Sequence, residues 1–279
     1  MKEIAENVYV ETFYPGTNVG CIVDERGAIC IDTPVLSEDA LQWKEQVKSV
    51  GGDPIRYVVY TNGHCDRILG TQYLGGTVVS HEITWQQIKH YLESNAYQSM
   101  CESLAERDPR GKGLQVVLPQ ITFTEHLLLY IGEEPVVLTW AAGPALWVRL
   151  PEQGILFAGD TVVVDAHPFL AEMDTFGWLK ALQRLRHKRF RADVIVPGRG
   201  PLCEKQDTKF TSNYLSRARA RVRSLYRVGK PKSELNTVVG DLMELVPSTV
   251  GDKEWLQRQI KLGLDHIYEE FKAADAVAG

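Results

Sequence analysis

The sequence lacks the features that would assign the chain to a disulfide-stabilised or membrane-embedded class. It has five cysteines among 279 residues, at positions 21, 30, 65, 101 and 203, and no CxxC pair. Such an odd, scattered set indicates reduced thiols rather than a disulfide framework. The first residues show no apolar stretch behind a basic segment, and no run of about 18 apolar residues occurs. No signal peptide and no membrane partner are expected, and the predicted location is cytoplasmic.

A basic surplus is also absent. Asp and Glu total 36 against 31 Lys and Arg, which gives a formal net charge of −5. This balance argues against a nucleic-acid partner, which a basic surface would normally attract. The remaining composition, 44% hydrophobic and 24% charged, is that of a globular chain. A chain of this length buries a sizeable core without disulfides.

Apolar runs predict two groups of strands, each followed by helices. Residues 7–13 and 18–24 are expected to form a hairpin across the YPGT turn. Ser37 is expected to cap a helix that ends near Val50. Further strands are expected at 27–32, 55–61, 76–81, 121–131, 134–143, 145–151, 154–164 and 192–201, and helices at 82–106, 175–187 and from 205 onward. Two strand groups flanked by helices favour a helix/sheet/sheet/helix sandwich.

Three of these strands end in polar clusters. They read VVYTNGHCDR (58–67), ILFAGDTVV (155–163) and VIVPGRGP (194–201). Loops that follow buried strands are where α/β proteins usually place their chemistry. The three clusters are therefore the candidate site, although each one alone is a weak signal.

The order of these motifs resembles that of the metallo-β-lactamase superfamily. The resemblance covers roughly residues 5–203 and includes ICIDTP, VVSHE, LFAGDTV, VPGRG and the stretch HPFLAEMDTFGWLKALQRL. It implies a four-layer αββα sandwich of the α/β class, and a helical C-terminal extension would follow it. We therefore expect a domain over 1–203 and an extension over 204–279 that packs on it. By ancestry the chain would be a hydrolase.

The metal ligands that the resemblance implies are only partly present. The family's H-x-H-x-D-H loop corresponds here to Asn62, His64, Asp66 and Arg67. The family's next histidine falls at Ala141 or Ala142, its bridging carboxylate is Asp160, and the histidine of its P-G-H-G motif is Arg199. Three of seven ligand positions thus keep a residue of the family. A catalytic zinc usually needs three protein ligands and an open position, and a guanidinium has no lone pair to donate.

The replacements suggest that guanidinium charge stands in for metal charge. Without a metal, Asp66 and Asp160 would repel each other across the pocket. Arg67 and Arg199 would offset that repulsion through charge-assisted hydrogen bonds. On this hypothesis the protein has no cofactor and binds a small molecule, as an anion, through the following side chains: Asn62, Arg67, Arg199 and His167.

Two alternatives remain open. In the first, His64, Asp66 and Asp160 hold one zinc, iron or manganese ion, with Asn62 or Cys65 assisting. His64 and Asp66 would then be catalytic, and the protein would hydrolyse an ester, a thioester or a lactam. In the second, the chain has kept only the fold and is a scaffold or interaction protein.

Other residues have a more ordinary interpretation. Asp32 ends a strand near the expected site, but a role in a turn or at a helix start is favoured. His81 is expected to be structural or to cap a helix. Phe13 and Tyr14 lie at the tip of the first hairpin, where a packed turn is the simpler expectation. For His167, a ligand contact and a loop position without a further role are equally weighted.

The segment after residue 204 is expected to be helical. Its arginines at 217, 219, 221 and 223 would spread around more than half of a helix and so form no single basic stripe. A solvated helix, or pairing with acidic residues of a partner subunit, is the favoured interpretation. The apolar residues of the segment would pack against the sandwich, cover the pocket or join two copies into a homo-oligomer.

Overall fold

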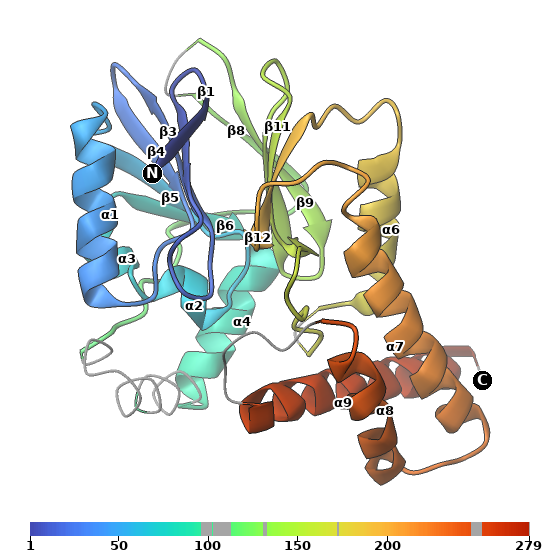
Figure 1. Ribbon diagram of the computed structural model, residues 1–279. Helices are drawn as coiled ribbons and strands as arrows, with labels where there is room; N and C mark the ends of the chain where they lie inside the picture. Colours follow the sequence, from blue (N-terminus) through green and yellow to red (C-terminus); the bar gives the residue numbers. More distant parts are fainter. Residues whose placement is uncertain (96–101, 103–112, 131–132, 172, 247–252, 279) are drawn as a thin grey trace.

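The computed structural model describes residues 1–95, 102, 113–130, 133–171, 173–246 and 253–278. Two β-sheets lie face to face between layers of helices (Figure 1). This arrangement is the expected αββα sandwich with C-terminal helices, and it confirms the fold class predicted from the sequence. Within the described residues, no helix has the length and apolar character needed to cross a bilayer.

The first sheet has seven strands in the order of the chain. They are β1 (Lys2–Ala5), β2 (Val8–Glu11), β3 (Val19–Asp24), β4 (Gly27–Ile31), β5 (Ile55–Val59), β6 (Thr77–His81) and β7 (Ile121–Phe123). The strands from β1 to β4 are antiparallel, and those from β4 to β7 are parallel. The expected hairpin is the β2–β3 pair, which confirms that prediction.

The second sheet has five strands in the order β12-β11-β10-β9-β8. They are β8 (His126–Leu129), β9 (Val136–Ala142), β10 (Ala145–Leu150), β11 (Ile155–Val163) and β12 (Val194–Arg199). Only the β11–β12 pair is parallel among the strands described in this sheet. Every residue of β11 is buried, as expected for a strand that is covered on both faces.

Helices cover the outer face of each sheet (Figure 1). Next to the first sheet lie α1 (Ser37–Ser49), α2 (Cys65–Ile68), α3 (Thr71–Leu74) and α4 (Glu82–Glu93). Next to the second lie α6 (Thr175–Arg186) and α7 (Lys209–Arg227). The 3-10 turn η2 (Lys232–Leu235), α8 (Asn236–Met243) and α9 (Lys253–Ala278) pack against α7. The apolar core is therefore layered, with one cluster between the sheets and others under the helices.

The C-terminal helices share their core with the second sheet. One buried cluster joins Trp147 and Leu156 of the sheet to Trp178 of α6, Leu215 of α7 and Leu264 of α9. All five of these side chains are fully buried. The C-terminal segment therefore packs against the sandwich of its own chain. This was one of the three roles considered for it.

Some local expectations differ from the structure. Ser37 is the first residue of α1, and Leu36 occupies the N-cap position without a side-chain cap. The helix expected over 82–106 is described only as α4, because 96–101 and 103–106 lie outside the described residues. The strand expected over 121–131 is divided into β7 and β8, which belong to different sheets.

Two arginines of α7 have acidic partners within the same chain. Arg219 forms an ion pair with Glu270 of α9, and Arg221 forms one with Asp241 of α8. Four cysteines are free thiols, namely Cys21, Cys30, Cys65 and Cys203, and Cys101 lies outside the described residues.

Candidate functional site

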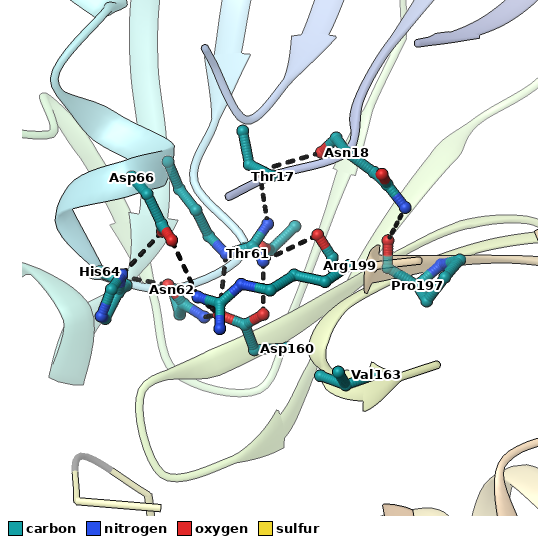
Figure 2. A network of polar contacts seen from close by, with 12 residues as sticks. Thr17, Asn18, Thr61, Asn62, His64, Asp66, Asp160, Val163, Pro197 and Arg199 are labelled. Atoms are coloured by element: carbon teal, nitrogen blue, oxygen red, sulfur yellow. Dashed lines mark hydrogen bonds and ion pairs between the residues drawn. The ribbon is translucent and has the colours of Figure 1, made fainter. Parts of the chain in front are cut away.

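The candidate site lies where strands of both sheets end. Asp32 follows β4, Asn62 to Arg67 follow β5, Asp160 lies on β11, and Arg199 ends β12. Because the carboxyl ends of these strands meet at one edge of the sandwich, their polar side chains converge (Figure 2). The three clusters that the sequence singled out thus form one contiguous network.

Arg67 lies at the centre of this network and is fully buried. Its Nε donates to Oδ2 of Asp160 over 2.9 Å, and its Nη2 donates to Oδ1 of the same carboxylate. Its Nη1 donates to Oδ2 of Asp32 over 2.9 Å and to Oγ1 of Thr17 over 2.8 Å. The remaining Nη2 hydrogen is directed to the carbonyl of Gly198, 3.0 Å away. A guanidinium has five N–H donors, so all of them are used.

The backbone is fitted closely around this guanidinium. A Cβ atom on Gly198 would lie 2.5 Å from Nη2 of Arg67 and 2.5 Å from Oδ1 of Asp160. No side chain larger than hydrogen is accommodated there without displacement. Asn18 links the β2–β3 hairpin to the segment around Gly198, because its Nδ2 donates hydrogen bonds to the carbonyls of Pro197 and Gly200.

Asp66 forms the outer half of the network. Its Oδ2 accepts a hydrogen bond from Nη2 of Arg199 over 2.8 Å, and its Oδ1 lies 2.7 Å from Nδ1 of His64. Arg199 also donates from Nε to the carbonyl of Gly16 over 2.8 Å, and its Nη2 lies 3.6 Å from Oδ2 of Asp160. Asn62 joins the two halves, because its Nδ2 donates to Oδ2 of Asp160 over 3.0 Å and its Oδ1 accepts from the His64 N–H over 2.9 Å.

An aromatic side chain covers the outer half. The ring of Phe169 stacks on His64 with centroids 5.0 Å apart, and the guanidinium carbon of Arg199 lies 3.8 Å from the centroid of the same ring. Trp255 of α9 meets Phe169 edge-on at 5.6 Å. The C-terminal helix therefore packs against the ring that covers this half of the network.

The pKa directions describe a network of ionised groups. Burial raises the pKa of Asp160, but Arg199 and Arg67 outweigh burial and hold that pKa below its usual range. Burial likewise opposes the charge of Asp66, whose pKa is nevertheless lowered by His64 and Arg199. Burial lowers the pKa of His64, yet the adjacent Asp66 raises it well above the ordinary value.

Asp32 is a third carboxylate of the network, and the preference for a turn or helix-start role was wrong. Its Oδ1 accepts from the Thr61 N–H over 2.8 Å, and its Oδ2 accepts from the Thr61 hydroxyl over 2.6 Å as well as from Arg67. Burial raises the pKa of Asp32 to about 6, although Arg67 and Thr61 oppose the rise. Its position directly after a buried strand was the signal that pointed to the site.

Two residues expected to contact a ligand are turned toward the protein. Arg67 is fully buried and has no donor left, so it acts on carboxylates rather than on a ligand. His167 is buried too, and its Nδ1 lies 3.1 Å from the hydroxyl of Tyr214 on α7. The sequence had pointed to the right segment, but Phe169, two residues further on, is the side chain that reaches the network.

The remaining candidates are placed more simply. His81 caps α4 by accepting a hydrogen bond from the Ile83 N–H, which confirms its structural interpretation. Tyr14 is buried and meets Trp43 edge-on, while Phe13 at the same turn is 87% exposed. Ala141 and Ala142 are buried at the end of β9 within the core under the C-terminal helices.

Comparisons with known proteins agree with this architecture. The sequence profile described as metallo-beta-lactamase superfamily matches residues 15–199. A metallo-beta-lactamase from Pontibacter korlensis is 25% identical, with a TM-score of 0.57, over 77% of this chain and 97% of that one. A metallo-beta-lactamase family protein from Thermus thermophilus is 15% identical, with a TM-score of 0.69, over 98% and 95%. The mono-zinc form of FIM-1 from Pseudomonas aeruginosa is 21% identical, with a TM-score of 0.58, over 78% and 94%.

Proposed function

This chain belongs to the metallo-β-lactamase superfamily, and we propose that it is a member in which guanidinium groups replace the metal ions. On this proposal the protein binds a small molecule beside Arg199 and His64 and does not hydrolyse it with a metal-bound water. The observation that carries the proposal is the position of Arg67. Its buried guanidinium spans Asp32 and Asp160 and uses all five of its donors.

The chemistry of the available donors supports this proposal. Both oxygens of Asp160 accept hydrogen bonds, and the two oxygens of Asp66 are engaged by Arg199 and His64. Nδ1 of His64 faces Asp66, which leaves Nε2 as its only nitrogen without a partner among the described residues. A catalytic zinc usually needs three protein ligands. As arranged here, the described residues do not fit the metal that a relative such as the mono-zinc form of FIM-1 holds.

The groups left for a ligand are few and positively charged. Nη1 of Arg199 and Nε2 of His64 have no partner within the described part of the chain. Their side chains are 11% and 20% exposed, and Phe169 lies against both. A small molecule with an anionic group and an apolar body would pair its charge with Arg199 and His64 and place its body near Phe169.

Metal analysis is the direct test. The full-length protein, produced in medium containing zinc, iron and manganese, should retain far less than one metal ion per chain after desalting. Its thermal melt should not change when zinc or a chelator is added, because a ligand that binds only the folded state would raise the melting temperature. Close to one ion per chain, together with a melting temperature that falls with chelator, would overturn the proposal.

That contrary result would favour the single-metal alternative. His64, Asp66 and Asp160 would then hold the ion, which would supply the activation of water needed to hydrolyse an ester, thioester or lactam. One observation favours this candidate: Arg199, unlike Arg67, retains some exposure and is held at Asp66 by a single hydrogen bond. Arg199 is therefore the arginine that an ion would have to displace.

A further inference from the structure

A second cluster of cationic side chains lies away from the candidate site, beside the C-terminal end of α6. An open groove of about 510 Å³ is lined by Arg149 of β10, Lys180 and Arg184 of α6, and Arg189 and Phe190 of the following loop. His187 also contributes to the wall, and no Asp or Glu does so among the residues that the structure describes. A pocket of this size accommodates a small organic molecule.

Arg149 is the unusual member of this cluster. It occupies β10, an interior strand that pairs with β9 and β11, so it extends from the middle of the sheet toward the layer of helices. Its Nε is buried and has no hydrogen-bond partner in the described part of the chain. Buried polar atoms of folded proteins nearly always have a partner, and an exception calls for an explanation.

A neighbouring guanidinium makes the charge of Arg149 less favourable. Burial and the neighbouring guanidinium of Arg184 both lower the pKa of Arg149. Among the described residues neither arginine forms an ion pair with a carboxylate, and Arg184 donates only to the carbonyl of Trp140, 3.0 Å away. Two like charges without a counter-charge destabilise the fold unless an anion neutralises them.

Aromatic rings hold the two guanidinium groups in place. The guanidinium carbon of Arg149 lies 4.4 Å from the ring centroid of Phe190, and that of Arg184 lies 4.8 Å from the ring centroid of Trp147. Trp147 and Phe190 also meet edge-on at 5.3 Å. Cation–π contacts of this kind orient a guanidinium without consuming its donors. Apart from the Arg184 Nη2 group bonded to Trp140, the N–H groups of the two arginines have no partner within the described residues and can meet an oxyanion.

We propose that this groove binds the phosphate groups of a small phosphorylated ligand, with Arg149 at its floor and Arg184, Lys180 and Arg189 at its rim. Guanidinium groups bind phosphate oxygens with paired, charge-assisted hydrogen bonds, and the lysine adds a point charge. The site is separate from the Arg67 network and does not depend on what that network binds.

The test uses pyrophosphate as the probe and the full-length protein. Pyrophosphate should raise the melting temperature by at least about 3 °C at concentrations well above its dissociation constant. Sodium chloride of equal ionic strength should not reproduce the shift. In the double variant Arg149→Met Arg184→Gln the shift should disappear, and in the single variant Arg184→Gln, which changes only an exposed side chain, it should fall by half or more.

Two control variants locate the effect. Arg217→Gln Arg223→Gln removes two exposed charges from α7 and should keep the full pyrophosphate shift. Arg199→Gln should keep it as well, because Arg199 contacts Gly16, Asp66, Asp160 and Phe169 and does not line the groove. Equal shifts in wild type and in the Arg149 and Arg184 variants would overturn the proposal. A shift that is lost only in Arg199→Gln would overturn it too, because the anion would then bind at the Asp66 site.

Discussion

Arg67 holds Asp160 by both carboxylate oxygens in the interior of the protein. Nε and Nη2 of the guanidinium donate to Oδ2 and Oδ1, and neither side chain is more than 6% exposed. A paired contact of this kind fixes both partners in orientation as well as in distance. It makes Arg67 a part of the folded structure, and its loss should be felt first as a loss of stability.

The substitution Arg67→Met should destabilise the fold strongly. It leaves Asp32 buried without its counter-charge and leaves Asp160 with only Arg199, 3.6 Å away, and breaking a buried ion pair in this way costs about 3–5 kcal/mol. The free energy of unfolding in urea measures the effect. The matched control is Arg191→Gln, which removes an arginine from an exposed pair with Asp193 and should cost about 0.5 kcal/mol or less. Equal losses in the two variants would contradict a central role for Arg67.

The substitution Gly198→Ala tests how tightly the backbone encloses the guanidinium. The added methyl group would meet Arg67 and Asp160 at 2.5 Å, so a loss of about 1–3 kcal/mol is expected. Gly240→Ala on α8 is the control, since nothing lies within 4 Å of its added Cβ. In a helix that change should stabilise by about 0.5–1 kcal/mol. If both variants shift the unfolding curve in the same direction, the backbone at Gly198 does not enclose Arg67 and Asp160 as tightly as the structure indicates.

The substitution Asp32→Asn tests the third carboxylate. An amide would replace an acceptor that serves Thr61 and Arg67, and would remove a charge next to the guanidinium, at an expected cost of about 2 kcal/mol. Asp165→Asn is a matched control, because Asp165 is exposed and has nearly the same backbone φ, 54° against 55° for Asp32. Asp165→Asn should change the denaturation midpoint little. If it lowers the midpoint as much as Asp32→Asn does, the loss at position 32 comes from the backbone conformation and not from the contacts of the carboxylate.

His266 should make the stability of the C-terminal helices depend on pH. A hydrogen bond to Glu270 raises the pKa of His266 above 6.5, although burial opposes the rise. The contribution is therefore fully present below the unfolded pKa of about 6.5 and is lost as pH rises through the higher folded pKa. Unfolding measured between about pH 5.5 and 8.5 should show the wild type and His266→Gln converging toward high pH. Parallel curves would contradict this assignment.

The fold was predictable because its signals are local and repeated. Buried strands such as β11 appear as continuous apolar runs, and α6 shows helical spacing, so element order and the layered architecture followed from the sequence. Boundaries were less accurate where the determining contact is distant. For example, the chain passes from the first sheet to the second at Thr124 and Glu125, between β7 and β8. The sequence near this turn has no pattern that predicts the change of sheet.

The site was predictable in its chemistry but less so in its geometry. The sequence indicated that arginines would offset Asp66 and Asp160, and Arg199 and Arg67 do contact these carboxylates. It did not indicate which of the two arginines would be buried. The burial of Arg67 depends on contacts with Thr17 and Gly198, which are distant from it in the sequence. Phe169 was missed for the same reason, since an aromatic residue in a loop has no pattern that reveals what it covers.

The balance of charges around Arg67 has a consequence for how ligands arrive. Three carboxylates, Asp32, Asp66 and Asp160, face two guanidiniums and the imidazole of His64 within one compact network. Opposite charges so close together cancel at a distance, and they project little field into the solvent. The rate at which a ligand binds to this network should thus depend little on ionic strength. The groove beside α6 has no acidic residue in its lining, so it should attract an anion over about a Debye length and lose that attraction as salt is added.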